Sequence, residues 1–163
     1  MLVLGVDPGS IVTGYGLIEK EDNNLVYVCG GEIVSPSSLP FYARIHKIFK
    51  DLLKVIKSYR PEEMSIEDLF FAKNVKSALK IGHARGAALV AAIEGGLKVF
   101  EYTPLQIKQS LVGYGRATKE QVRYMVEMVL SIDSAKLSLD TCDALAAAIC
   151  HHNWVRFETD TNE

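Results

Sequence analysis

The hydrophobic pattern changes its period near residue 40, and this change constrains the fold more than any other feature of the sequence. Before it, β-branched and apolar residues form three short runs, at 2–6, 13–18 and 25–34. Such runs, separated by polar turn residues, predict three strands of an antiparallel meander. After it, apolar side chains recur at helical spacing from Phe41 to Tyr59, and Pro61 ends the pattern. The chain therefore combines an antiparallel β-segment with helical units.

The second half of the chain alternates a short apolar run with longer helical segments. Residues 64–67 follow the first helix directly and are too few for another helix, so they predict a buried strand that returns parallel to the first. A helix rich in Ala and Gly is predicted over 74–93, and a fifth strand over 98–102. Further helices are predicted to begin at Pro104, at Thr118 and near Ser138.

This order of elements predicts a mixed α/β domain. We expect strands 1–3 to be antiparallel, strands 4 and 5 to be parallel, and helices to cover both faces of the sheet. No repeat or linker interrupts the pattern, so we expect a single domain over residues 1–155. Residues 156–163 are polar and are predicted to form a short tail.

The charge of the chain is unevenly distributed. The net charge is only −2, from 18 basic and 20 acidic residues, which by itself suggests no nucleic-acid partner. From Lys73 to Arg123, however, nine basic residues face three acidic ones, so this stretch carries +6 and the remainder −8. A basic segment of this kind is a candidate surface for DNA.

Cysteine content and hydropathy limit the compartment. Three cysteines without a C-x-x-C spacing favour neither a disulfide framework nor a cysteine zinc site. The N-terminal segment lacks the basic start of a signal peptide, and no window of about 18 residues is apolar enough to span a membrane. We therefore expect a soluble, cytoplasmic protein that does not associate with membranes.

Four carboxylates stand at positions that the predicted fold brings together. Asp7 and Glu67 end the first and fourth strands, whose carboxyl ends share one edge of the sheet. Asp140 and Asp143 are three residues apart at the start of a helix and so share one face. Each acid alone has an ordinary reading, such as a turn cap for Asp7 or a helix cap for Asp140. Together they predict a site for Mg²⁺ or Mn²⁺, which prefer oxygen ligands, and a pair of such ions suits phosphoryl chemistry.

The same residues carry a resemblance to a known family. The sequence contains Asp7-Pro8-Gly9-Ser10-x-x-Thr13-Gly14-Tyr15-Gly16, Ile66-Glu67-x-x-Phe70-x-Ala72-Lys73-Asn74, Ala84-Arg85-Gly86 and Asp140-x-x-Asp143-Ala144-Leu145-Ala146. In this order and spacing they resemble the RuvC family of bacterial Holliday junction resolvases, over nearly the whole chain. The resemblance implies an RNase H-like fold and an endonuclease that nicks two opposed strands of a four-way DNA junction in recombination and repair, leaving 5′-phosphate and 3′-hydroxyl ends.

The resemblance also implies residue roles. Asp7, Glu67, Asp140 and Asp143 would hold the catalytic metal, with two Mg²⁺ ions per site and Mn²⁺ as a substitute. Lys119 would stabilise charge on the reacting phosphate, Lys108 would contact a scissile phosphate, and Phe70 would enter the junction. The basic stretch and the family motifs complete a candidate set for DNA contact that consists of Phe70, Lys73, Lys76, Lys80, Arg85, Lys108 and Lys119.

The family further implies a homodimer, because a junction with two-fold symmetry needs two matched sites. The Ala- and Gly-rich helix over 74–93 is our candidate interface, and association with a branch-migration motor is expected. Two features depart from the family: Ile11 stands where a basic residue is common, and the C-terminal tail is short and acidic.

Several alternatives remain open at this stage. Lys76 and Lys80 suit a solvated helix face as well as a DNA contact, and Phe71 suits a core position. A metal site at His151 and His152 is not favoured, because too few other ligands converge on them, and their role stays open. An ATP-dependent kinase of the actin-like fold would need a second lobe, and a module that binds junctions without cutting them would not need the four acids.

Overall fold

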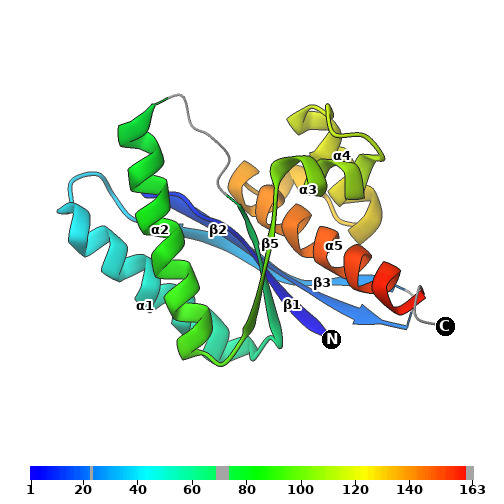
Figure 1. The fold of residues 1–163 in the computed structure, drawn as a ribbon, viewed down its shortest axis with the longest axis horizontal. Coiled ribbons are helices and arrows are strands. Elements are labelled where there is room, and N and C mark those ends of the chain that lie inside the picture. Colours follow the sequence, from blue (N-terminus) through cyan, green and yellow to red (C-terminus); the bar gives the residue numbers. More distant parts are fainter. Residues whose placement is uncertain (23, 69–73, 161–163) are drawn as a thin grey trace.

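The computed structural model describes residues 1–22, 24–68 and 74–160, and they form one five-stranded mixed sheet with helices on both faces (Figure 1). Strand order across the sheet is β3-β2-β1-β4-β5. The first three strands are antiparallel, and β1, β4 and β5 run parallel, as the sequence predicts. The strands are β1 (Leu2–Asp7), β2 (Val12–Glu21), β3 (Asn24–Val34), β4 (Glu63–Glu67) and β5 (Lys98–Tyr102).

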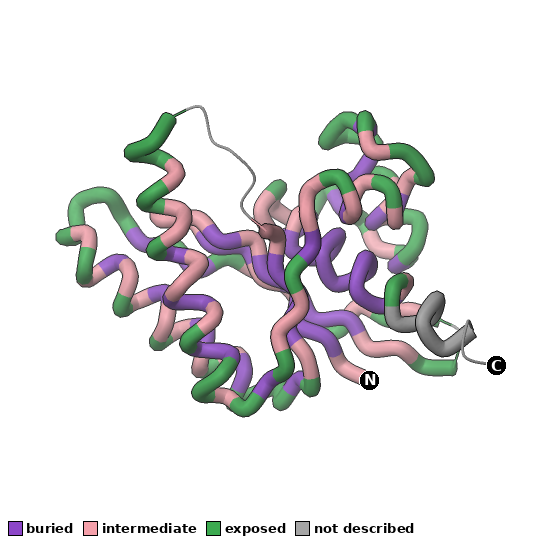
Figure 2. Tube along the Cα trace, viewed as in Figure 1, coloured by how far each residue is buried: buried purple, intermediate pink, exposed green. Residues whose placement is uncertain are grey.

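The helices form two layers, one on each face of the sheet (Figure 1). They are α1 (Phe41–Tyr59), α2 (Val75–Glu94), α3 (Pro104–Val112), α4 (Lys119–Leu130) and α5 (Leu139–Asp160), with a 3₁₀ turn η1 (Ser134–Lys136) before α5. One core lies between the sheet and α1 and α2, and a second lies between the sheet and α3, α4 and α5. Figure 2 shows the buried residues concentrated in the central strands and in α5. No helix among the described residues is long and apolar enough to cross a bilayer.

Local signals set the helix starts. Thr103 and Thr118 each accept a hydrogen bond from the backbone N–H three residues on and form capping boxes with Gln106 and Gln121. Asn74 caps α2 through its side-chain oxygen, which accepts from Ser77 N at 3.2 Å. These caps agree with the predicted boundaries.

The last helix is longer than the sequence suggests. The apolar pattern of the sequence that begins near Ser138 runs to Ile149, but α5 continues to Asp160. His151 and His152 explain the extension in part, because both are buried and bonded to the sheet. The imidazole of His151 bonds to Glu63 Oε2 and to Tyr102 Oη, each at 2.7 Å, and His152 Nε2 lies 3.2 Å from the carbonyl oxygen of Ile18. The structure therefore places the two histidines in the core.

Glycines let α5 lie directly on β1 and β2. A Cβ at Gly5 would overlap the backbone carbonyl of Ala144, and a Cβ at Gly14 would overlap that of Asp140. Because glycine has no Cβ, the helix backbone approaches the sheet closely enough to place its first turn beside the end of β1. This close packing positions Asp140 and Asp143.

Candidate active site

Two strands and one helix bring the four predicted carboxylates to one end of the sheet. Asp7 and Glu67 are the last residues of β1 and β4, which pair as parallel neighbours. Asp140 and Asp143 lie in the first two turns of α5. Ser138 begins that helix, its hydroxyl accepting from Thr141 N at 3.1 Å, and acids at a helix N-terminus interact favourably with the helix dipole.

A cavity of about 240 Å³ lies between these acids and the helices α3 and α4. It is lined by Asp7, Glu67, Pro104, Ile107, Lys108, Lys119, Val122, Asp143 and Ala146. Three carboxylates and two ammonium side chains thus face one small space with an apolar wall. Such a space can hold a cation together with an anionic phosphate.

The carboxylates perturb one another strongly. Burial, followed by the charges of Asp143, Glu67 and Asp140, raises the pKa of Asp7 from 3.8 to about 7. Burial and Asp143 also raise the pKa of Glu67, while Lys119 and Lys108 oppose the rise. A positively charged ligand would stabilise the ionised form of these carboxylates, which burial and mutual repulsion disfavour. Titratable groups with perturbed pKa values cluster at functional sites.

Lys119 supplies a positive charge inside this group. Its Nζ lies 3.3 Å from Asp143 Oδ2, and the charge of Asp143 raises the pKa of Lys119. As the first residue of α4, Lys119 is held at the cavity by the Thr118 cap. Lys108, on α3, lines the same cavity. The structure therefore places both lysines that the resemblance assigns to phosphate beside the acids.

Glu32 is a further acid at the site that the sequence analysis missed. It is exposed on β3, in register with Gly14, which pairs in turn with Asp7, so the three residues cross the sheet in one row. Burial raises the pKa of Asp140, and the neighbouring Glu32 raises it further. In the sequence, Glu32 stands out as a lone acid in an otherwise largely apolar strand. Its place beside the other acids could not be predicted without the register between β3 and β2.

The donor set fits a hard divalent cation. Only carboxylate oxygens converge, and cations such as Mg²⁺ and Mn²⁺ prefer oxygen ligands. Within the described part of the chain, no three acidic, His or Cys side chains already stand at ligating distance of one point.

The structure separates the other predicted DNA-binding residues. Lys76 and Lys80 are exposed on α2. Arg85, on the same helix, is mostly buried and pairs with Asp68 and Glu101. Phe70 and Lys73, like Phe71, lie outside the described residues. Ile11, which departs from the family pattern, is 49 % exposed.

Comparisons with known proteins agree with this architecture. The family model described as crossover junction endodeoxyribonuclease RuvC matches residues 3–151. The protein of that name from Geobacter sulfurreducens is 52 % identical over 153 residues, covering 94 % of this chain and 93 % of its own length. That from Pelotomaculum thermopropionicum is 45 % identical over 159 residues, covering 96 % of this chain and 97 % of its own length. The structure of Thermus thermophilus RuvC with Holliday junction substrate superimposes with a TM-score of 0.91 at 36 % identity, over 98 % of this chain and 97 % of that one.

The mixed sheet, with carboxylates at the ends of β1 and β4 and on the facing helix, defines an RNase H-like nuclease. Membership within this class follows from the extent of the sequence matches. The chain belongs to the RuvC family of crossover junction endodeoxyribonucleases.

Proposed function

We propose that this protein resolves four-way DNA junctions by hydrolysing one phosphodiester in each of two opposed strands. The observation that carries the proposal is the cavity at the sheet end that three carboxylates and two lysines line, with Asp140 one helical turn from Asp143, in a chain of this family. The products are a 5′-phosphate and a 3′-hydroxyl at each nick.

The carboxylates of Asp7, Glu67, Asp140 and Asp143 hold two Mg²⁺ ions in this proposal, with Mn²⁺ as a substitute. Ions held there would supply Lewis-acid chemistry for phosphodiester hydrolysis. Because the pKa of Asp7 is raised to about 7, a cation held by this carboxylate at neutral pH would compete with a proton. Lys119 and Lys108 donate to the phosphate oxygens, on which negative charge increases during attack.

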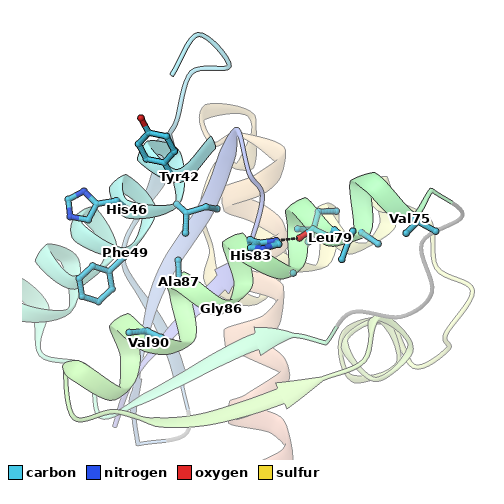
Figure 3. Close-up of a pocket in the computed structure, with 13 residues that line it drawn as sticks. Tyr42, His46, Phe49, Val75, Leu79, His83, Gly86, Ala87 and Val90 are labelled. Atoms are coloured by element: carbon cyan, nitrogen blue, oxygen red, sulfur yellow. Dashed lines mark hydrogen bonds between the residues drawn. The ribbon is translucent and has the colours of Figure 1, made fainter. Parts of the chain in front are cut away.

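A homodimer completes the proposal, because two opposed nicks need two sites related by a two-fold axis. Supporting this, α1 and α2 form an open apolar groove of about 970 Å³ on the face of the molecule remote from α5 (Figure 3). Val75, Leu79 and Val90 of α2 line it with 72 %, 59 % and 59 % of their surface exposed. Contiguous exposed apolar surface of this kind marks association sites, and a second copy of this chain is the proposed occupant.

Two further expectations come from the sequence, the first from the family resemblance and the second from cysteine content and hydropathy. A branch-migration motor is expected to deliver junctions to the dimer, and the cytoplasm is the expected compartment. Both stay predictions.

The direct test is cleavage of synthetic four-way junctions against linear duplexes of the same sequence, with Mg²⁺, with Mn²⁺ and with EDTA. We expect symmetrical nicks in the junction that need a divalent metal, and intact linear duplex. Sedimentation velocity of the same preparation is expected to show a dimer. Junction binding with no cleavage in either metal would instead support a module that recognises junctions without cutting them.

A further inference from the structure

Arg85 contacts the end of β4 from the neighbouring helix. Its Nε donates to the backbone carbonyl of Glu67 at 3.3 Å. Its Nη2 pairs with Asp68 at 3.5 Å and with Glu101 on β5. Only 14 % of the Arg85 side chain is exposed, against 46 % for Asp68 and 48 % for Glu101. One guanidinium thus joins α2 to the ends of two adjacent strands.

These contacts fall where the chain leaves the sheet. Glu67 is the last residue of β4, and the next backbone N–H, of Asp68, donates to the carbonyl of Tyr102 at 2.8 Å. This bond already joins the Glu67–Asp68 peptide to the end of β5. The Arg85 contact to the Glu67 carbonyl holds the same peptide from the side of α2, next to the residue whose side chain lines the cavity.

The geometry differs from that of a residue available to DNA. Lys76 and Lys80 on the same helix are exposed, whereas the Arg85 guanidinium is turned inward onto a carbonyl and two carboxylates. A planar guanidinium can serve several acceptors at fixed angles, which an ammonium on a flexible stem cannot do. The sequence predicted that Arg85 contacts DNA, and the structure gives it intramolecular partners instead.

We infer that Arg85 is a positioning residue for Glu67: it holds the end of β4 so that this carboxylate is preorganised for metal binding. The inference rests on the proposed metal site and adds a residue to it. Residues that orient metal ligands from outside typically change affinity or activity about 10- to 100-fold when removed. Because α2 also lines the proposed dimer groove, the same helix supports the subunit contact and the Glu67 peptide.

The test compares Arg85→Ala, Arg85→Lys and Lys80→Ala in three assays. These are Mn²⁺ binding by calorimetry without DNA, single-turnover junction cleavage against metal concentration, and junction affinity against salt without divalent metal. For Arg85→Ala we expect the Mn²⁺ affinity to fall about 10- to 100-fold and the metal concentration at half-maximal cleavage rate to rise accordingly. Junction affinity is expected to be unchanged. Arg85→Lys keeps the charge but loses the planar geometry, so it is expected to resemble Arg85→Ala in metal binding.

Lys80→Ala is the matched control, since it removes one positive charge from the exposed face of the same helix. If Lys80 contacts phosphate, its loss lowers the salt slope of junction binding by about one and leaves Mn²⁺ binding unchanged. The inference is overturned if Arg85→Ala lowers the salt slope of junction binding, leaves Mn²⁺ binding unchanged, and Arg85→Lys restores junction affinity. Unchanged Mn²⁺ binding in Arg85→Ala would overturn it as well.

Glu101→Gln guards against a folding defect, because it removes one partner of Arg85 and leaves the guanidinium in place. It is expected to weaken Mn²⁺ binding in the same direction as Arg85→Ala and by a smaller factor, with a melting temperature near that of the wild type. Wild-type Mn²⁺ binding by Glu101→Gln and Arg85→Lys together would count against the inference. If the wild-type protein binds Mn²⁺ but cuts no junction, the proposed function fails while the Mn²⁺ comparison still decides the role of Arg85.

Discussion

Lys119 Nζ lies 3.3 Å from Asp143 Oδ2, so the first residue of α4 is paired with an acid in the second turn of α5. The pair closes one side of the cavity that Asp7 and Glu67 line. A divalent cation and the Lys119 ammonium compete for the carboxylate of Asp143, whereas the phosphate of a substrate attracts both. Lys119 is therefore expected to weaken metal binding and to speed the reaction.

Removal of this ammonium is predicted to strengthen metal binding while slowing the reaction. Lys119→Ala deletes a positive charge that opposes the raised pKa values of Asp7, Glu67 and Asp140, so the site becomes more attractive to Mn²⁺. The cleavage rate is expected to fall about 10²- to 10³-fold, as for loss of a donor that stabilises developing charge. Calorimetry with Mn²⁺ and single-turnover cleavage measure the two effects. Lys136→Ala, which breaks a pair with Asp133 away from the cavity, serves as the control. Weaker Mn²⁺ binding by Lys119→Ala would show that Lys119 orients Asp143.

Neutralisation of any one of the four acids is predicted to abolish cleavage and to leave junction binding largely intact. Asp7→Asn, Glu67→Gln, Asp140→Asn and Asp143→Asn each remove a metal ligand whose Lewis-acid contribution is several kcal/mol, and each 1.36 kcal/mol is tenfold in rate. Cleavage rates and gel-shift affinities are measured side by side. Asp51→Asn, an acid paired with Lys47 and Lys54 on α1, is expected to cut at the wild-type rate. Wild-type rates in two of the four variants would remove the site assignment.

The raised pKa of Asp7 predicts how metal-free stability depends on pH. The folded carboxyl, with its pKa at about 7, binds its proton more tightly than the unfolded one at 3.8, so stability falls as pH rises through this interval and stays low above it. This loss of folding free energy is at most about 4 kcal/mol. Asp7→Asn should remove it and raise the melting temperature in EDTA at pH 8 by roughly 5–10 °C.

The control variant, Asp51→Asn, is expected to change the melting temperature in the opposite direction. Hydrogen bonds from Lys47 and Lys54 lower the pKa of Asp51, so this carboxylate stabilises the fold at pH 8 and Asp51→Asn is expected to lower the melting temperature. Melting curves between pH 4 and pH 8 decide the matter. A lower melting temperature for Asp7→Asn than for the wild type at pH 8 would make Asp7 a structural partner.

Periodicity and capping made much of this architecture predictable. Asp7 and Glu67 were found from sequence because each ends a run of apolar residues, and Thr118 because a capping box is a local signal. The intramolecular contacts of Arg85 and the presence of Glu32 at the site were not predicted, for a common reason: their partners belong to other elements. A long arginine can turn outward or inward, and only packing of α2 against β4 decides between them. The row that includes Glu32 depends on the register of an edge strand, which no short motif encodes.

The groove between α1 and α2 is predicted to be the dimer contact. Leu79→Glu or Val90→Glu places a charge in apolar surface that a partner would bury, so each should convert the dimer to a monomer in sedimentation velocity and abolish paired nicking. Both side chains are 59 % exposed in the single chain, so the fold should persist. Met128→Glu changes a comparably exposed side chain on α4, outside the groove, and should remain dimeric. A dimer that survives both groove variants would place the interface elsewhere.

Phe70 is predicted from the sequence to enter the junction, because this residue lies outside the described part of the chain. It stands three residues after Glu67 and four before the cap of α2, so it follows a proposed metal ligand and precedes a helix with exposed lysines. An aromatic ring stacked on an unpaired base contributes roughly 1–3 kcal/mol to holding a strand open. Phe70→Ala is therefore predicted to slow cleavage of fully paired junctions much more than of junctions with an unpaired crossover, at little cost in stability, and Phe70→Leu to behave nearly as badly. A core Phe70 would instead lose about 3–5 kcal/mol of stability on truncation and impair both substrates equally. Melting curves taken with both cleavage assays separate the two outcomes, and equal impairment with a large melting shift would exclude insertion into the junction.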